Sequence, residues 1–345
     1  MSKSMKTTNK PVAVLISDVH YSVHNLALAD KSVSLAIELA NNLNVPLIVA
    51  GDLHDTKANL RGECVNAMLQ TFRTCYQKIY VMIGNHDKIN EKSAEHSLNF
   101  LREDNRVVIV DEPMTLPDSN FLLMIPYQHD PAEARKLAKA GSNYKVLIMH
   151  QGITGSNSGE YIQDKSAITK DDVAGLRVIS GHYHTRQTIE LPRGGKWDYI
   201  GNPYSLGFGE ANDPEKGFQV LYDDGSLEFI PTNLPSHRII RCGWDDMHGL
   251  FWGPILKIKD NEKLWIKVEG TKEQLNDVTK DWLRKQFHIP GDFRLELIST
   301  ETTTKAPEKK NLSQADVLDH LIDSLTNTSD EGKTRLKSTW KNLCE

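Results

Sequence analysis

The chain has 345 residues, with 41 basic and 46 acidic side chains and a formal net charge of −5. This length allows one large domain with one or two smaller ones, and a hydrophobic content of 39% is ordinary for a soluble globular protein. The mild acidity excludes the broad basic surface of a protein that grips nucleic acid unaided. A DNA partner would therefore have to be argued from the functional site.

Short β-branched runs alternate with helix-forming stretches over the first two-thirds of the chain. The apolar runs predict buried strands over 12–17, 46–50, 79–83, 120–127, 145–149 and 176–180, and a hairpin with an Asp-Gly turn over 218–230. Helix formers predict helices over 26–43 and 60–72. This alternation predicts an α/β fold for residues 1–230.

The composition changes after residue 230. Residues 263–270, a helix-like stretch over 272–287 and residues 293–299 predict a compact β-α-β unit, so that 231–299 forms a small second domain. In the helix-like stretch Leu275, Val278 and Trp282 share one face. Residues 300–311 have linker composition.

The final segment, 312–345, predicts a helix-loop-helix. Ser313 caps a predicted helix over 313–325, and a second helix follows over 334–343. Two short amphipathic helices bury little apolar surface on each other, so we expect them to dock on a partner protein. The alternative is that they pack back on the second domain.

The four cysteines give no sign of a metal or disulfide framework. Cys64, Cys75, Cys242 and Cys344 are widely spaced and form no Cys-x-x-Cys pair. We therefore expect reduced thiols and a cytoplasmic location, which is the host cytoplasm if the chain is phage-encoded. The apolar run before Asp18 is too short for a secretory signal, and no window approaches a membrane span.

Polar motifs stand directly after five of the predicted strands. They are "DVH" (18–20), "GDLHD" (51–55), "GNHD" (84–87), "HQG" (150–152) and "GHYH" (181–184). Ligands of open α/β sheets bind at the carboxyl ends of strands, so the five motifs are expected to converge on one site.

The motifs supply seven candidate metal ligands: Asp18, His20, Asp52, Asn85, His150, His182 and His184. Oxygen and imidazole donors without sulfur suit manganese, iron or zinc. Seven ligands suffice for two ions when a carboxylate bridges them, and we assign the bridge to Asp52. Taken singly, Asp18, Asn85 and His150 also fit roles in turns or in the core. Apart from His86 in "GNHD", the remaining histidines, among them His54 inside "GDLHD", receive no role.

The five motifs in this order resemble the calcineurin-like binuclear metallophosphoesterases, whose pattern is D-x-H, G-D-x-x-D, G-N-H-D/E, H and G-H-x-H. The resemblance implies a four-layer α/β/β/α sandwich with a small α+β capping domain and a C-terminal helical tail. It assigns one metal to Asp18, His20, Asp52 and His184, and the other to Asp52, Asn85, His150 and His182. His86 matches the family's catalytic histidine, and Asp55 matches the carboxylate that orients it.

The implied chemistry is hydrolysis of a phosphoester. Two divalent cations lower the pKa of a shared water, and His86 as imidazolium protonates the departing oxygen. Protein phosphatases of the superfamily read G-D-x-x-D-R-G and G-N-H-E, whereas this chain has "GDLHDTK" and "GNHD". The difference disfavours phosphomonoester substrates.

Residues 197–222 resemble the run that follows G-H-x-H in the SbcD and meiotic-recombination DNA repair nucleases. The layout is closest in plan to the recombination endonuclease subunits of T-even-type bacteriophages. The resemblance implies a metal-dependent DNA nuclease, both exonuclease and endonuclease, acting in recombination and double-strand-break repair. It further implies manganese as the metal, with magnesium, iron or zinc as alternatives, a DNA-binding capping domain, a homodimer, and an SbcC-like ATPase partner bound through 312–345.

One residue departs from part of that family. Eukaryotic and archaeal members have a histidine three residues after the bridging aspartate, where this chain has Asp55 as bacterial members do. No second catalytic histidine is therefore carried over. The competing hypotheses are a stand-alone phosphodiesterase acting on nucleotides or small diesters, and an inactive fold that serves as a scaffold.

Overall fold

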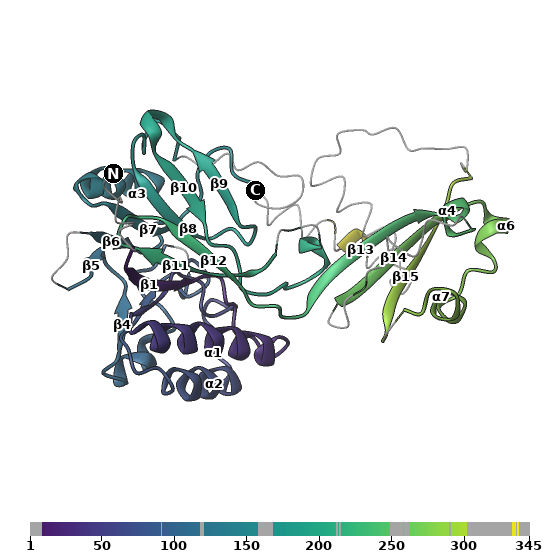
Figure 1. Cartoon of the computed structure of the whole chain (residues 1–345), viewed down its shortest axis with the longest axis horizontal. Coiled ribbons are helices and arrows are strands. Elements are labelled where there is room, and N and C mark those ends of the chain that lie inside the picture. The colour runs from purple at the N-terminus through teal and green to yellow at the C-terminus, as the bar shows by residue number, and fades with distance from the viewer. Residues whose placement is uncertain are drawn as a thin grey trace, which may run out of the picture.

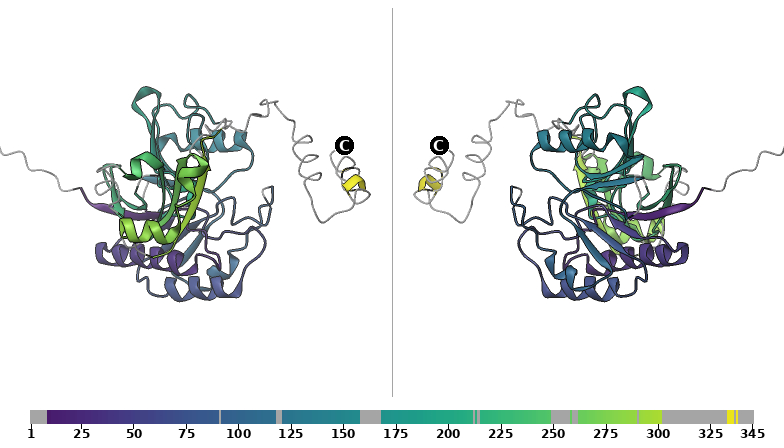
Figure 2. Two further views of the ribbon diagram at one scale, coloured as in Figure 1. Left: turned by 90° about the vertical axis from the view of Figure 1, so that its right-hand side faces the viewer. Right: turned by 90° about the vertical axis from the view of Figure 1, so that its left-hand side faces the viewer.

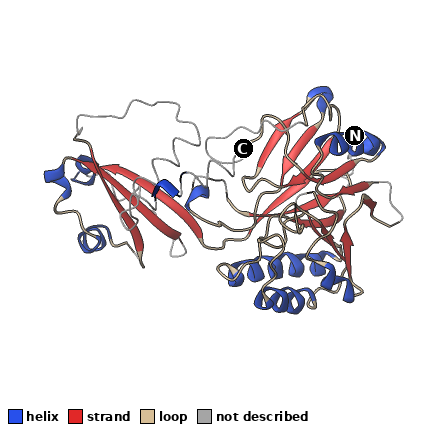
Figure 3. Cartoon of the chain, turned by 180° about the vertical axis from the view of Figure 1, so that it is seen from behind, coloured by secondary structure: helices blue, strands red, loops and turns tan. Residues whose placement is uncertain are grey.

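The computed structural model describes residues 9–90, 92–117, 121–157, 168–211, 213, 215–248, 258, 262–289, 291–301, 333–335 and 337. Two six-stranded sheets form the main body, and a three-stranded sheet stands to one side of it (Figure 1). The view from behind shows the same division, with helices against the outer faces of the main body and beside the small sheet (Figure 3).

The first sheet has the strand order β12-β11-β1-β2-β3-β4, in which β1 to β4 are parallel. Its strands are β1 (Pro11–Ile16), β2 (Leu47–Val49), β3 (Ile79–Met82), β4 (Val107–Val110), β11 (Gly217–Tyr222) and β12 (Leu227–Pro231). Helices α1 (Leu26–Leu43) and α2 (Gly62–Phe72) cover its outer face (Figure 1). Alternation along β1 sends Val14 and Ile16 toward these helices, and Ala13 and Leu15 toward the other sheet.

The second sheet has the order β5-β6-β7-β8-β10-β9. Its strands are β5 (Met114–Thr115), β6 (Leu122–Ile125), β7 (Val146–His150), β8 (Arg177–Gly181), β9 (Gln187–Glu190) and β10 (Lys196–Tyr199). Helix α3 (Pro131–Ala140) packs on its outer face through Ala134 and Ala138. Asp130 caps this helix by accepting a hydrogen bond from the N–H of Ala132 at 2.8 Å. The sandwich is therefore layered α/β/β/α, which confirms the predicted fold class.

The third sheet, β13-β14-β15, consists of β13 (Ser236–Gly243), β14 (Glu262–Gly270) and β15 (Phe293–Ser299), all parallel. We call it the capping sheet; with α4 (Trp244–His248), α6 (Lys272–Leu275) and α7 (Lys280–Phe287) it has its own apolar core. The end-on views in Figure 2 show it in front of and behind the sandwich. The single helix predicted over 272–287 is wrong, because Thr279 caps a new helix by accepting from the N–H of Trp282 at 3.1 Å.

The tail lies almost wholly outside the described residues. Of the helices predicted over 313–325 and 334–343, only 333–335 and 337 are described, and they are helical. Within the part of the chain that the structure describes, no helix is long and apolar enough to cross a bilayer. Cys64, Cys75 and Cys242 are buried free thiols.

Candidate metal centre

The five motifs come from two groups of neighbouring parallel strands. Those after β1, β2 and β3 lie at one edge of the first sheet, and those at the ends of β7 and β8 lie at the matching edge of the second. Backbone hydrogen bonds tie the first two motifs together, from Asp18 N–H to the Gly51 carbonyl and from His20 N–H to the Asp52 carbonyl. The chain order of the motifs thus becomes one cluster in space.

The backbone at this edge is held in an unusual conformation. Asp18, His20, Asp52 and His182 have positive φ angles of 53°, 51°, 51° and 91°. Residues with a Cβ rarely adopt this left-handed region, and such strain persists only where the surrounding structure imposes it. All four are predicted metal ligands, so the strain coincides with the candidate centre.

Two glycines of the motifs allow neighbouring main-chain and side-chain atoms to approach closely at this edge. A Cβ on Gly84 would overlap the carboxylate and the backbone N of Asp52, and a Cβ on Gly181 would overlap Ser17 Oγ and the Ala50 carbonyl. The glycines of "GNHD" and "GHYH" are therefore required by the packing of the ligands around them.

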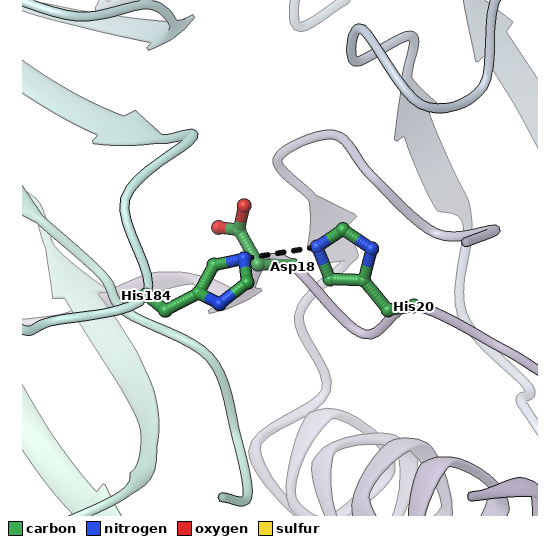
Figure 4. Close-up of side chains that lie close together, drawn as sticks. All are labelled: Asp18, His20 and His184. Carbon is green, nitrogen blue, oxygen red and sulfur yellow. Dashed lines mark hydrogen bonds between the residues drawn. The ribbon is translucent and has the colours of Figure 1, made fainter. Parts of the chain in front are cut away.

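Asp18, His20 and His184 form the outer group of the centre (Figure 4). Their ligand atoms all lie within 4.8 Å of one another. His20 and His184 turn their Nε2 atoms toward each other at 3.0 Å. The other nitrogen of each ring faces a carboxylate, with His20 Nδ1 at 3.3 Å from Asp55 Oδ1 and His184 Nδ1 at 2.8 Å from Glu210 Oε1.

Asp52, Asn85, His150 and His182 form the inner group. His150 Nε2 lies 3.2 Å from Asp52 Oδ2 and 3.1 Å from Asn85 Oδ1, and Asn85 Oδ1 lies 2.9 Å from His182 Nδ1. His150 Nδ1–H donates to the Ala50 carbonyl at 2.7 Å. Asp52 Oδ2 is also 3.9 Å from His20 Nε2, so one carboxylate oxygen faces both groups. This position suits a bridging ligand.

The charges of the inner group are strongly coupled. Burial alone would raise the pKa of the Asp52 carboxyl, but the neighbouring His150 ring holds that pKa well below its usual range. Burial alone would lower the pKa of His150, but the Asp52 carboxylate raises it to about 9. Each of these two side chains therefore favours the charged form of the other.

The donor set fits divalent cations. Because His150 Nδ1–H is donated to Ala50, its Nε2 lone pair faces two oxygen acceptors, an arrangement that requires a proton or a cation between them. In the outer group, the two Nε2 atoms that face each other at 3.0 Å likewise require a proton or a cation between them. The residues would hold two ions in these places, with Asp52 between them.

His86 lies beside the outer group, with its ring centroid 4.8 Å from that of His20. Its Nδ1–H donates to the backbone carbonyl of Asp55 at 2.7 Å, and its backbone N–H donates to Asp52 Oδ1 at 2.8 Å. The Asp55 carboxylate faces His20 instead. Asp55 thus contacts both histidines, but it reaches His86 through the main chain.

Besides Glu210, two further residues lie at the centre without having been predicted. Asp87 is fully buried and accepts hydrogen bonds from the N–H groups of His54 and Gly84 at 2.9 and 2.8 Å, which fixes the "GNHD" turn. Burial and the nearby Asp52 raise the pKa of Asp87 to about 7. Tyr127, at the end of β6, stacks on His182 with centroids 6.0 Å apart. The same strand-end argument applied to β6 would have identified Tyr127.

Comparison with protein families agrees with this geometry. The model of the calcineurin-like phosphoesterases matches residues 12–186, which is half of the chain and includes every predicted metal ligand. The chain belongs to this family.

A curated protein from Enterobacteria phage T4, "Exonuclease subunit 1", is 27% identical over 237 residues. The match covers 66% of this chain and 65% of that protein, so the chain spans just under two thirds of its relative's length. This likeness supports a relationship to a phage nuclease.

Two solved structures are also similar to this chain. A dimetal phosphatase from Danio rerio is 10% identical with a TM-score of 0.43, over 65% of this chain and 97% of its own. Phosphopantetheinyl hydrolase from Mycobacterium tuberculosis is 15% identical with a TM-score of 0.32, over 56% of this chain and 91% of its own.

Proposed function

We propose that this chain is a metal-dependent DNA nuclease, the hydrolytic subunit of a recombination and repair complex. The observation that supports it is that seven residues with oxygen or nitrogen donor atoms gather around two places, with the Asp52 carboxylate facing both. Two metal ions form a recurring device for phosphoryl displacement. The likeness to the phage T4 exonuclease subunit favours a DNA phosphodiester as the substrate.

The role proposed for each side chain follows from the atoms that it can present to a metal ion or to the substrate. The two ions, for which we propose manganese, would activate a water and offset charge on the phosphate oxygens. Asp18, His20, Asp52 and His184 would hold one, and Asp52, Asn85, His150 and His182 the other. His86 has Nδ1 engaged with Asp55, which leaves Nε2 to carry a proton to the leaving oxygen. His86, His182 and His184 are only partly buried, so a substrate can reach them.

The proposed partners are based on the predicted domain organisation and on the net charge of the chain. We propose that residues 231–299 act as the capping domain over DNA, and that the segment 312–345, joined by the linker 300–311, binds an SbcC-like ATPase. Because the chain has a net charge of −5, we propose that such a partner supplies part of the electrostatic attraction to DNA. A homodimer would align two active sites on one substrate.

The proposal is tested by assaying the purified chain with Mn²⁺ or Mg²⁺ on three substrates. These are linear duplex DNA, single-stranded circular DNA and bis(p-nitrophenyl) phosphate. We expect cleavage of DNA that requires the metal and is lost in Asp52→Asn. Hydrolysis of the small diester alone, with both DNA substrates intact, would overturn the nuclease proposal and favour the stand-alone phosphodiesterase.

The partner proposal has its own test. Deleting 312–345 should abolish co-purification with a co-expressed SbcC-like ATPase and leave Mn²⁺ binding unchanged. Retention of the ATPase by the shortened chain would contradict the docking role of this segment.

A further inference from the structure

The short 3₁₀ turn Phe208–Glu210 contacts the metal centre with one side chain and the capping sheet with another. It follows β10 by eight residues and lies outside the matched family segment, 12–186. Its two contacts thus join the metal centre to the capping sheet. No role follows for it from the metal ligands alone.

Glu210 reaches the centre through His184. Its Oε1 lies 2.8 Å from His184 Nδ1, so the ring donates Nδ1–H to the carboxylate and Nε2 is left facing His20. A histidine held in this way has a fixed tautomer and a fixed ring orientation. Glu210 therefore determines which nitrogen of His184 faces the cation.

The Glu210 carboxylate is itself firmly anchored. Asn202 Nδ2 donates to it at 3.0 and 3.1 Å, and Leu206 N–H donates to it at 3.0 Å. Lys216 Nζ pairs with it at 3.2 Å, while a second Lys216 contact, to Asp213, measures 2.7 Å. These donors hold the carboxylate in one orientation toward His184. All three donors belong to the segment between β10 and β11 that carries the turn, so the position of the carboxylate is set by the position of that segment.

Phe208 carries the turn's other contact. Its ring meets His237 on β13 edge-on at 4.8 Å and Trp265 on β14 edge-on at 5.4 Å. Ser205, three residues earlier, lies 3.0 Å from His237 Nδ1 through its hydroxyl. Both contacts are to the capping sheet. A change in the place of that sheet would therefore move the turn.

We propose that the Phe208–Glu210 turn couples the position of the capping sheet to metal binding, with Glu210 as the positioning residue for His184 and Phe208 as its contact with the sheet. The inference rests on the metal centre and is independent of whether DNA is the substrate. With the sheet in its present place, the turn presents the Glu210 carboxylate to Nδ1 of His184. Displacement of the sheet would release His184 and weaken the outer ion while the inner ion stays bound.

The first test measures Mn²⁺ binding by calorimetry for Glu210→Ala and Glu210→Gln. We expect a loss of affinity of about 10- to 100-fold for one of two ions in Glu210→Ala, and a smaller loss in Glu210→Gln, which keeps an acceptor. Glu215→Gln is the matched control, because Glu215 is exposed and lines the neighbouring pocket between the sandwich and the capping sheet. It should bind both ions like the wild type.

A metal-free measurement separates positioning from general stability. In ¹⁵N spectra of histidine-labelled protein treated with a chelator, His184 should show the Nδ1–H tautomer, with its signals assigned from His184→Gln. Glu210→Ala should shift these signals toward a tautomer mixture, whereas Glu215→Gln should not. Unchanged His184 signals in Glu210→Ala would overturn the positioning role, whatever the thermal stability of the variant.

The coupling itself is tested by a double-mutant cycle. Phe208→Ala and Trp265→Ala should each weaken the same ion by about 2- to 30-fold, the range of such indirect effects. Trp265 lies outside the apolar core of the capping domain, so its removal should leave that domain folded. In the Glu210→Ala background, Phe208→Ala should have no further effect.

The outcomes distinguish this inference from the proposed function. If Phe208→Ala weakens metal binding equally with and without Glu210, the turn does not act through Glu210 and the inference fails. If the wild type binds two ions and none of the variants changes either affinity, the inference fails while the metal centre stands. If the wild type binds no Mn²⁺, the metal centre itself is refuted.

Discussion

The two halves of the metal centre use similar side chains but are held in different ways. In the inner group, His150 is fully buried and its Nδ1–H is donated to a backbone carbonyl at the end of β2. In the outer group, the His184 side chain is 32% exposed and its Nδ1–H is donated to the side chain of Glu210, 26 residues later. The backbone of the sandwich fixes one half, and a turn against the capping sheet fixes the other.

The chemistry of the candidate ligands and the rigidity with which they are held are therefore encoded by different parts of the chain. Asp52 stands between the halves, buried and with an oxygen toward each. The inner half should therefore form whenever the two sheets pack together, whereas the outer half should respond to changes at the surface. Substitutions at single residues can test whether the two halves are held independently, and the first of these is at Asp52, which both halves share.

Asp52→Asn should remove both halves together. Loss of the bridging charge is expected to abolish binding of two Mn²⁺ ions. We also expect DNA cleavage to fall by at least about 10³-fold, where each tenfold corresponds to about 1.36 kcal/mol of lost transition-state stabilisation. Metal content by mass spectrometry and a cleavage assay measure the two effects. Retention of two ions with normal affinity would show that Asp52 is no bridge.

His86→Ala should separate chemistry from binding. The ring contacts the backbone of Asp55 and lies next to the outer group, but it is assigned to no ion. We expect turnover to fall by about 10²- to 10⁴-fold while both ions are retained. A variant that loses an ion would show that His86 is a ligand and not the proton donor.

Gly84→Ala should damage the inner half through packing alone. The added Cβ would overlap Asp52, and forced overpacking of this kind costs about 1–3 kcal/mol of stability. Thermal unfolding and Mn²⁺ titration should show a lower Tm and weaker binding. Gly62→Ala at the start of α2 is the control, since nothing lies within 4 Å of its added Cβ. Equal behaviour of the two variants would contradict the packing argument.

The pH dependence of the metal-free protein should report the inner half by itself. The pKa of His150 is raised from 6.5 to about 9 in the folded protein, so its contribution to stability is complete below pH 6.5 and is lost as the pH rises through 9. The Tm of chelator-treated protein should fall by several degrees over this interval. His150→Gln should lack this slope, and an identical slope in the variant would assign the effect to another group.

The sequence predicted that the seven candidate ligands gather at one place, because motifs at the ends of neighbouring parallel strands share an edge. Apolar periodicity located α1 at its observed bounds, Leu26–Leu43. It passed over Val107–Val110, a four-residue apolar run that forms β4, and α3, whose Asp-Pro start is a recognisable helix signal. These two elements carried a local signal.

Other features had no local signal. The break within 272–287 depends on Thr279 acting as a cap, and Thr279 stands inside an otherwise continuous helical pattern. In the sequence, Glu210 was marked only by its place within residues 197–222, the run that resembles the DNA repair nucleases. Its contact with His184 depends on how the chain returns to the sheet edge after β10, which is a tertiary property.

Two cations that share the carboxylate of Asp52 at one edge of the sandwich should be visible by anomalous diffraction from crystals of the full chain grown with Mn²⁺. We expect two peaks about 3.5–4 Å apart, one against His20 and His184 and one against Asn85 and His150, with Asp52 between them. A single peak, or two peaks that do not share Asp52, would refute the bridging role of this carboxylate.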